Sequence, residues 1–132
     1  MFGLLFKRNR LLKDRYVLGR WGEHQCEKFL RRKGLKTLTR NFSCNAGEID
    51  LIMVDNDRAI VFVEVKTRLD EEFTPTEEVV NKTKADKMAK TSRYFLSVHD
   101  INNRPYRFDI VTVTLGRQGP TDIRHYKNAF VR

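Results

Sequence analysis

The chain has 132 residues, a length that fits one folded domain and is too short for two independent cores joined by a linker. Hydrophobic residues make up 40% and charged residues 33%, with three prolines and seven glycines, which excludes a collagen-like, disordered or membrane-spanning chain. The 26 Lys and Arg against 17 Asp and Glu leave a formal net charge of +9, so we expect polyanions as partners.

The first 17 residues are rich in Lys and Arg and lack sustained hydrophobic periodicity. This predicts a mobile basic N-terminal arm, residues 1–17, followed by a single domain over residues 18–132. The opening apolar run is too short for a secretory signal, and Cys26 and Cys44 match no metal-ligand spacing. We therefore expect a cytoplasmic protein with free thiols, no zinc site and no membrane partner.

Residues 18–33 place their apolar side chains on one side of a 3.6-residue wheel, which predicts an amphipathic helix ending at Gly34. Glu23 lies at the border of the apolar stripe, so we expect its carboxylate at the seam between helix and core. Residues 35–42 alternate loosely and predict a strand at or near a sheet edge, and residues 43–47 predict a turn.

Residues 48–54 and 59–65 are short, rich in β-branched residues and separated by a polar stretch of turn-forming residues. This pattern predicts a hairpin of two central strands. Apolar residues occupy both faces of the two strands, as in strands that other layers cover on both sides.

The C-terminal half begins with a Thr-x-x-Glu capping box at residues 74–77, which predicts helical structure through residue 96, with Asn81 as a second candidate cap. The inner stripe is predicted to hold Ala85, Met88, Ala89, Ser92, Phe95 and Leu96. The outer face is basic and carries Lys82, Lys87, Lys90 and Arg93. Residues 106–114 predict a fourth strand, and one short strand or turn is expected around His125. The order α-β-β-β-α-β predicts an α/β fold with a mixed sheet and helices on its faces.

Three charged residues, Asp50, Glu64 and Lys66, interrupt the otherwise apolar central hairpin. Burying an unpaired carboxylate costs several kcal/mol, so these groups should be paired, bind a metal or line an open cleft. Because side chains alternate along a strand, Glu64 and Lys66 share a face.

The hairpin register decides whether Asp50 joins the other two charges. A three-residue loop places Asp50 directly opposite Glu64, whereas a two-residue loop pairs Asp50 with Val63 and sends the two carboxylates to opposite faces. We predict the convergent register, because the alternative scatters buried charges without compensation.

Facing carboxylates repel unless a cation stabilises both ionised forms, and hard oxygen ligands without nearby His or Cys suit Mg²⁺ or Mn²⁺. Such an ion beside Lys66 could activate water and stabilise the charge that develops when a phosphodiester is hydrolysed. The competing interpretation is a structural ion pair of Lys66 with Glu64 or Asp50 at a strand end, which is the commoner role of an isolated Glu-x-Lys.

The same residues carry a family resemblance. Residues 47–52 (GEIDLI) and 63–68 (VEVKTR) resemble the signature of the bacterial YraN-like proteins, which are similar to PD-(D/E)XK nucleases and archaeal Holliday-junction resolvases. The other matching positions are Gly22-Glu23, Asn41-Phe42, Lys84, Arg107-Phe108-Asp109 and Ala129-Phe130. The chain departs from the nuclease motif at Ile49, where the motif has proline, and at Ala85, where many relatives carry a polar or basic residue.

The resemblance implies a restriction-endonuclease-like αβββαβ core with a mixed central sheet flanked by helices. It implies Asp50 and Glu64 as metal ligands, Lys66 as the catalytic lysine, and Glu23 as a helix-borne acid that binds the metal through water. Further implications are DNA as substrate, including branched or otherwise structured DNA, and a homodimer by analogy with resolvases.

Three functions fit these patterns: a metal-dependent endonuclease, a nucleic-acid-binding module of the same fold without turnover, and, more weakly, a scaffold for an acidic protein. For the first two, the candidate nucleic-acid contacts are Lys82, Lys84, Lys87 and Arg68. Arg68 and Asp109 have a structural alternative, a pair near the site. Candidates for stacking on bases are Trp21, Tyr94 and Tyr106, although an aromatic beside a helix stripe more often packs in the core.

Overall fold

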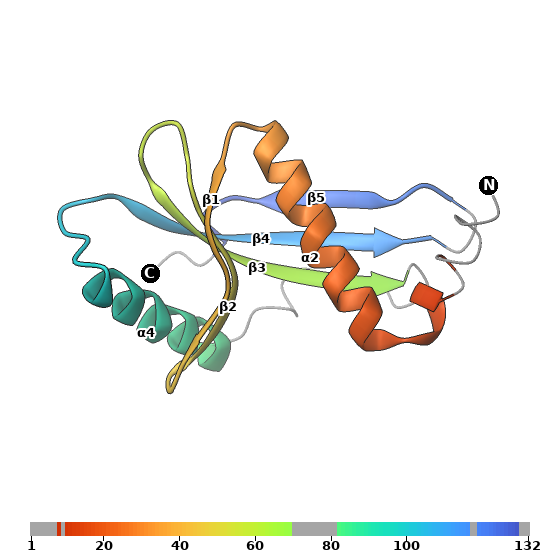
Figure 1. The fold of residues 1–132 in the computed structure, drawn as a ribbon, viewed down its shortest axis with the longest axis horizontal. Coiled ribbons are helices and arrows are strands. Elements are labelled where there is room, and N and C mark those ends of the chain that lie inside the picture. Colours follow the sequence, from red (N-terminus) through yellow and green to blue (C-terminus); the bar gives the residue numbers. More distant parts are fainter. Residues whose placement is uncertain (1–7, 9, 70–81, 117–118, 130–132) are drawn as a thin grey trace.

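The structure of the chain is a computed structural model, which describes residues 8, 10–69, 82–116 and 119–129 (Figure 1). In chain order the elements are α2 (Arg15–Arg32), β1 (Lys36–Cys44), β2 (Gly47–Val54), β3 (Ile60–Leu69), α4 (Lys82–Val98), β4 (Tyr106–Leu115) and β5 (Asp122–Tyr126). This order confirms the predicted αβββαβ arrangement, and β5 is the short strand that was one of the two structures expected around His125. The predicted capping box at residues 74–77 and the cap at Asn81 lie outside the described residues.

The five strands form one mixed sheet in the order β1-β2-β3-β4-β5. Strands β1, β2 and β3 are antiparallel neighbours, β4 runs parallel to β3, and β5 runs antiparallel to β4. Figure 1 shows α2 lying across the β3–β4 part of the sheet and α4 beside β2. The parallel β3–β4 pair is the reason that α4 lies between them in sequence, because parallel strands need a crossover connection.

Two apolar clusters cover the two faces of the sheet, as the central strands predicted. The cluster under α2 is made of Cys26, Leu30, Leu35, Leu51, Met53, Val61, Val63, Val111 and Val113. The cluster under α4 is made of Ile49, Ile52, Ile60, Phe62 and Phe95. Trp21 packs against the first cluster, which agrees with the packing role rather than the stacking role considered from the sequence. Residues of β3 therefore point alternately toward α2 and α4.

Helix α2 begins at Arg15, earlier than the expected residue 18, because Asp14 caps it. The Oδ1 atom of Asp14 accepts hydrogen bonds from the backbone N–H groups of Tyr16 (3.0 Å) and Val17 (3.2 Å). Residues 10–13 are also helical, and Leu11 is buried in a small cluster with Leu18, Leu69 and Leu115. In the described part of the predicted N-terminal arm, the chain is thus helical and contacts the domain.

The β2–β3 hairpin has the predicted register. Ile52 pairs with Phe62 and Val54 with Ile60. The N–H of Asp55 donates to the carbonyl of Ala59 (2.9 Å), so the loop consists of the three residues 56–58. Its last residue, Arg58, has a φ of 73°, the left-handed conformation that closes three-residue hairpins.

A buried ionic network joins β4 to β5. Asp109 is fully buried and accepts hydrogen bonds from Nε2 of His125 (2.7 Å) and Nε of Arg107 (3.1 Å). Burial alone would raise the pKa of Asp109, but the hydrogen bonds from His125 and Arg107 hold it below its ordinary range. Arg68, considered above as its partner, instead donates to Oγ1 of Thr114 (3.4 Å).

Replacing Asp109 by Asn should lower the free energy of unfolding at pH 7 by about 3–5 kcal/mol, because Arg107 would lose a buried counter-charge and His125 the carboxylate that it contacts. A carboxylate whose pKa is lowered by folding contributes to the free energy of unfolding above its unfolded pKa, and this contribution disappears as the pH falls through the folded pKa. Urea denaturation should therefore show the difference between wild type and Asp109→Asn shrinking in acid. Asp122→Asn, which breaks the exposed pair with Arg124, should cost less than about 1 kcal/mol; equal losses in the two variants would contradict the assignment.

Gly22 allows α2 to approach β3 closely. A Cβ atom at this position would lie 1.8 Å from Oγ1 and 2.7 Å from Cβ of Thr67. Gly22→Ala gains about 1 kcal/mol of helix propensity, but the overlap involves the base of a side chain on a packed strand, and overpacking costs about 1–3 kcal/mol. We expect a net loss of stability by urea denaturation. Gly19→Ala is the matched control, since no atom lies within 4 Å of its added Cβ, and it should stabilise the protein.

Candidate active site

Asp50 lies where β2 and β3 separate. The backbone pairing of the two strands ends at Leu51 and Val63, and one further step in the same register places Asp50 opposite Glu64. The Oδ2 atom of Asp50 accepts a hydrogen bond from the N–H of Val65 (2.8 Å). The carboxylate of Asp50 thus takes the place of a backbone acceptor, and this hydrogen bond fixes its position beside Glu64.

Glu64 forms an ion pair with Lys84 of α4. The distance between Nζ of Lys84 and Oε1 of Glu64 is 2.5 Å, and the Glu64 side chain is 14% exposed. Lys84 was predicted as a nucleic-acid contact, and the structure places it directly on the acidic pair. It supplies positive charge where two carboxylates meet.

Glu23 reaches the same region from α2. With the amide nitrogen of Asn41 directed toward Glu23, Asn41 donates to Oε1 of Glu23 (3.1 Å) and accepts from Nη1 of Arg20 (3.1 Å). Asn41 comes between the β1–β2 pairs Arg40–Leu51 and Phe42–Ile49, a register that places it opposite Asp50, and its φ of 52° is left-handed. Asn adopts this conformation more readily than most residues, and at Asn41 it occurs in the residue whose amide bonds to the carboxylate of Glu23. Arg20 and Asn41 thus position Glu23.

Lys66 lies two residues beyond Glu64 on β3 and is exposed. Strand alternation puts it on the same face as Glu64. The predicted residues Asp50, Glu64 and Lys66 therefore occupy adjoining rungs of the sheet, with Asp50 and Glu64 largely buried and Lys66 open to solvent.

The electrostatics of the site reflect an excess of negative charge. Burial and the nearby charges of Glu64 and Glu23 together raise the pKa of Asp50 to about 7, although the hydrogen bond from the Val65 N–H and the charge of Lys84 act to lower it. Burial also raises the pKa of Glu23, with Arg20 and Asn41 opposing and Glu48 and Glu64 reinforcing the shift. Neighbouring carboxylates repel each other when both are ionised, and a cation bound between them stabilises both ionised forms.

Asp50 and Glu64 suit a hard divalent ion that keeps much of its water. The described residues contain no group of three or more His, Cys, Asp or Glu side chains placed to hold a metal. Mg²⁺ is commonly bound by one or two carboxylates together with several waters, whereas a structural zinc site needs four protein ligands. The oxygen donors of Asp50 and Glu64 therefore fit Mg²⁺ or Mn²⁺, provided that the ammonium of Lys84 shares or leaves Glu64.

The acidic pair is open to solvent on the α4 side. A groove of about 410 Å³ runs between the β2 end of the sheet and α4, and its walls are Gly47, Glu48, Asp50, Glu64, Lys84, Lys87 and Met88. A smaller hollow of about 110 Å³ on the α2 side contains Glu23, Arg20 and Asn41, and Asp50 borders both spaces. The carboxylates thus line an accessible groove rather than a closed ion-pair network.

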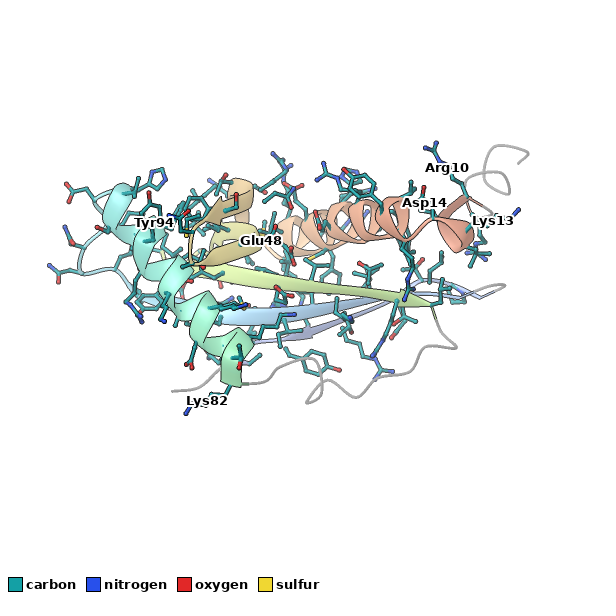
Figure 2. The ribbon with its side chains drawn as sticks, turned by 90° about the horizontal axis from the view of Figure 1, so that it is seen from below. Arg10, Lys13, Asp14, Glu48, Lys82 and Tyr94 are labelled. Atoms are coloured by element: carbon teal, nitrogen blue, oxygen red, sulfur yellow. The ribbon has the colours of Figure 1, made fainter. Side chains whose placement is uncertain are left out.

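The four predicted nucleic-acid contacts have different surroundings. Lys82 and Lys87 are exposed on α4, Lys87 also lines the groove, and Figure 2 shows Lys82 at the start of the helix. Lys84 lies inside the groove. Arg68 is 9% exposed and bonded to Thr114, so its guanidinium is less available than the three lysines. The basic wall of the groove is therefore formed by α4.

Sequence reasoning missed the pairing of Lys84 with Glu64, and the positioning of Glu23 by Arg20 and Asn41. Asn41 belonged to the family match, but no periodicity indicated its left-handed backbone. Arg20 comes about one helical turn before Glu23 on the polar side of the helix and was given no role at the site. A search for residues opposite Asp50 in the β1–β2 register could have found Asn41.

Together the sheet order, the α4 crossover and the acidic pair at the β2–β3 opening define an α/β protein with a restriction-endonuclease-like core. Residues 22–113 match the family model described as Uncharacterised protein family UPF0102. The chain therefore belongs to the UPF0102 family, which confirms the YraN-like resemblance. The matched segment contains Glu23, Asp50, Glu64, Lys66 and Lys84.

Individual relatives cover nearly the whole chain. A UPF0102 protein of Caldicellulosiruptor bescii is 40% identical over 115 residues, 86% of this chain and 96% of the relative. One from Caldicellulosiruptor saccharolyticus is 39% identical over 114 residues, which are 86% of this chain and 96% of the relative. One from Pelotomaculum thermopropionicum is 34% identical over 117 residues, which are 88% of this chain and 97% of the relative. Their names state the family and no activity. In the part of the chain that the structure describes, no helix is long and apolar enough to cross a membrane.

The raised pKa of Asp50 predicts a pH-dependent loss of stability. A carboxyl whose folded pKa is about 7, against an ordinary value of 3.8, keeps a proton that the unfolded chain releases. As the pH rises from about 4 to about 7, the free energy of unfolding of the wild type should therefore fall relative to that of Asp50→Asn, by up to about 1.4 kcal/mol per pH unit. Urea denaturation across this range measures the difference. Asp122→Asn is the exposed control, and parallel curves for wild type and Asp50→Asn would show that Asp50 ionises freely.

Proposed function

We propose that this protein is a metal-dependent nuclease that hydrolyses phosphodiester bonds in DNA, including branched or otherwise structured DNA. The observation that carries the proposal is the placement of Asp50 and Glu64 on facing strands at an open groove, with Lys66 on the next rung and lysines of α4 along the wall. A basic wall attracts a polyanionic backbone, and the acidic pair at its base provides a place for a cation between protein and phosphate.

Asp50 and Glu64 would hold Mg²⁺ or Mn²⁺. When bound, the ion supplies Lewis-acid stabilisation of the phosphate charge and lowers the pKa of a coordinated water. The Val65 N–H keeps Asp50 oriented, and Lys84 neutralises Glu64 when the ion is absent. In this role Lys84 competes with the metal for Glu64, and it becomes available to a phosphate once the metal is in place.

Lys66 orients the attacking water and offsets the negative charge that develops on the phosphate. In the reaction the water oxygen forms a bond to phosphorus, the bond from phosphorus to the leaving oxygen breaks, and a proton reaches that leaving oxygen. Glu23, held by Asn41 and Arg20 beside Asp50, binds waters of the site and accepts a proton from them, a task that its raised pKa suits.

A second function has an observation in its favour: a nucleic-acid-binding module of the same fold without turnover. The ammonium of Lys84 already occupies one oxygen of Glu64, and such a contact could replace the metal permanently. In that case the groove would bind phosphates through α4 while Asp50 and Glu64 remained a structural acidic pair.

A cleavage assay with Mg²⁺ or Mn²⁺ on linear, nicked and branched DNA separates the two functions. Wild type should cut, and Glu64→Ala and Lys66→Ala should each lose at least about a hundredfold in rate, because each removes a group that acts on the transition state. Asp122→Ala and Lys36→Ala change exposed charges outside the groove and should cut at the wild-type rate.

Metal binding provides the second measurement. Titration calorimetry should detect Mg²⁺ or Mn²⁺ binding to wild type and none to Asp50→Ala. Equal cleavage by wild type and the Glu64 and Lys66 variants would indicate a contaminant. Tight DNA binding without metal binding would favour the module without turnover and reject the nuclease.

A further inference from the structure

A second hollow continues the groove away from the acidic pair. It has a volume of about 420 Å³ and lies between the β1–β2 turn and α4, with walls formed by Ser43, Cys44, Asn45, Ala46, Lys90 and Tyr94. Ala46 adjoins Gly47 of the first groove in sequence, and Lys90 lies about one helical turn beyond Lys87. The two spaces therefore follow one another along the same hairpin and the same helix.

Tyr94 presents an aromatic ring to this second hollow. The residue is 51% exposed, and its ring lies 6.2 Å from that of Phe42 at an angle of 34°. Phe42 in turn packs edge-on against the buried Phe95 at 5.2 Å. Tyr94 is thus supported from the core side and open on the other, which is the arrangement of a rigid stacking platform rather than of a core residue.

Positive charge surrounds the ring. Lys90 precedes Tyr94 by four residues and so is its neighbour on the helix surface. Lys87, Lys90 and Arg93 are exposed, and none of them forms an ion pair with another residue in the described ranges of the chain. Figure 2 shows Tyr94 toward the end of α4 away from Lys82, in the region of the hairpin that carries Glu48.

We propose that Tyr94 and Lys90 form a subsite for an unpaired nucleotide, with the base stacked on the ring of Tyr94 and the adjoining phosphate beside Lys90. This inference rests on the proposed function and specifies its substrate class: nucleic-acid strands with unpaired nucleotides next to the phosphate at Asp50 and Glu64. Tyr94 follows Lys84 by ten steps of the helix, which span about 15 Å, a distance that a short run of nucleotides covers.

Unpaired nucleotides fit this subsite for a geometric reason. A base inside a duplex is stacked on both faces and cannot offer one to Tyr94, whereas an unpaired base can turn outward onto an aromatic side chain. The volume of the hollow lies in the range of small-molecule sites. Stacking on an aromatic ring accepts any base, so the subsite would select strand structure rather than sequence.

The experiment measures binding without divalent metal, so that no strand is cut. Fluorescence anisotropy compares a duplex with the same duplex carrying a short single-stranded tail, for wild type, Tyr94→Leu and Tyr94→Phe. Tyr94→Leu should weaken binding of the tailed duplex about tenfold and leave the plain duplex within about twofold, because it removes one base–aromatic stack. Tyr94→Phe keeps the ring and should bind as wild type does.

Two controls separate stacking from general effects. Tyr16 of α2 is 74% exposed and lies outside both hollows, so Tyr16→Leu should leave both affinities unchanged. Lys90→Gln should reduce the salt dependence of tailed-duplex binding by about one released counterion. A fluorescent adenine analogue in the tail should report stacking with wild type and lose that signal with Tyr94→Leu, while thermal melting establishes that the variant is folded.

The outcomes distinguish this inference from the nuclease itself. Equal losses on both substrates, unchanged affinities, or a wild type that binds neither substrate would overturn the subsite. If wild type cuts and depends on Glu64 while Tyr94→Leu binds tails normally, the nuclease stands and the subsite fails. A selective loss of tail binding without any cleavage would support the subsite and reject hydrolysis.

Discussion

A hairpin closed by three residues puts two carboxylates on facing strands. The left-handed Arg58 lets the chain reverse over residues 56–58, and the register that follows sets Asp50 opposite Glu64. A shift of one residue would turn Asp50 to the other face of the sheet, because side chains alternate along a strand. The meeting of the two candidate metal ligands at the groove depends on this register.

The carboxylates are kept together by the elements around them. Each acid is held by one contact from a neighbouring element. Asp50 accepts a hydrogen bond from the Val65 N–H, Glu64 forms an ion pair with Lys84, and Glu23 accepts a hydrogen bond from Asn41. These contacts offset part of the repulsion but leave the pKa of Asp50 raised to about 7. The remaining unfavourable charge is what a divalent ion would relieve, and the same charge would explain why α4 places basic residues along the groove.

The charged side chains at the two ends of β2 are arranged differently. Near the β2–β3 hairpin loop, Asp55 and Asp109 share Arg107, and His125 completes a closed network. At the other end of β2, Asp50 and Glu64 open onto a groove. The first arrangement pairs its buried charges with one another, with only Nη2 of Arg107 lacking a hydrogen-bond partner among the described residues of this network. The second leaves its charges accessible, which is the condition for binding a ligand.

Much of the fold could be predicted from periodicity, since the apolar stripes of α2 and α4 and the β-branched runs of β2 and β3 are local patterns. The sequence alone also determined the candidate acids, because charged residues within an apolar hairpin are costly unless they have a partner. Only the tertiary structure decided that Lys84 faces Glu64, that Asn41 and Arg20 position Glu23, and that Tyr94 lies in a hollow that follows the groove along α4. These are contacts between elements distant in the chain, and their geometry depends on sheet register and helix packing, which no local spacing of residues encodes.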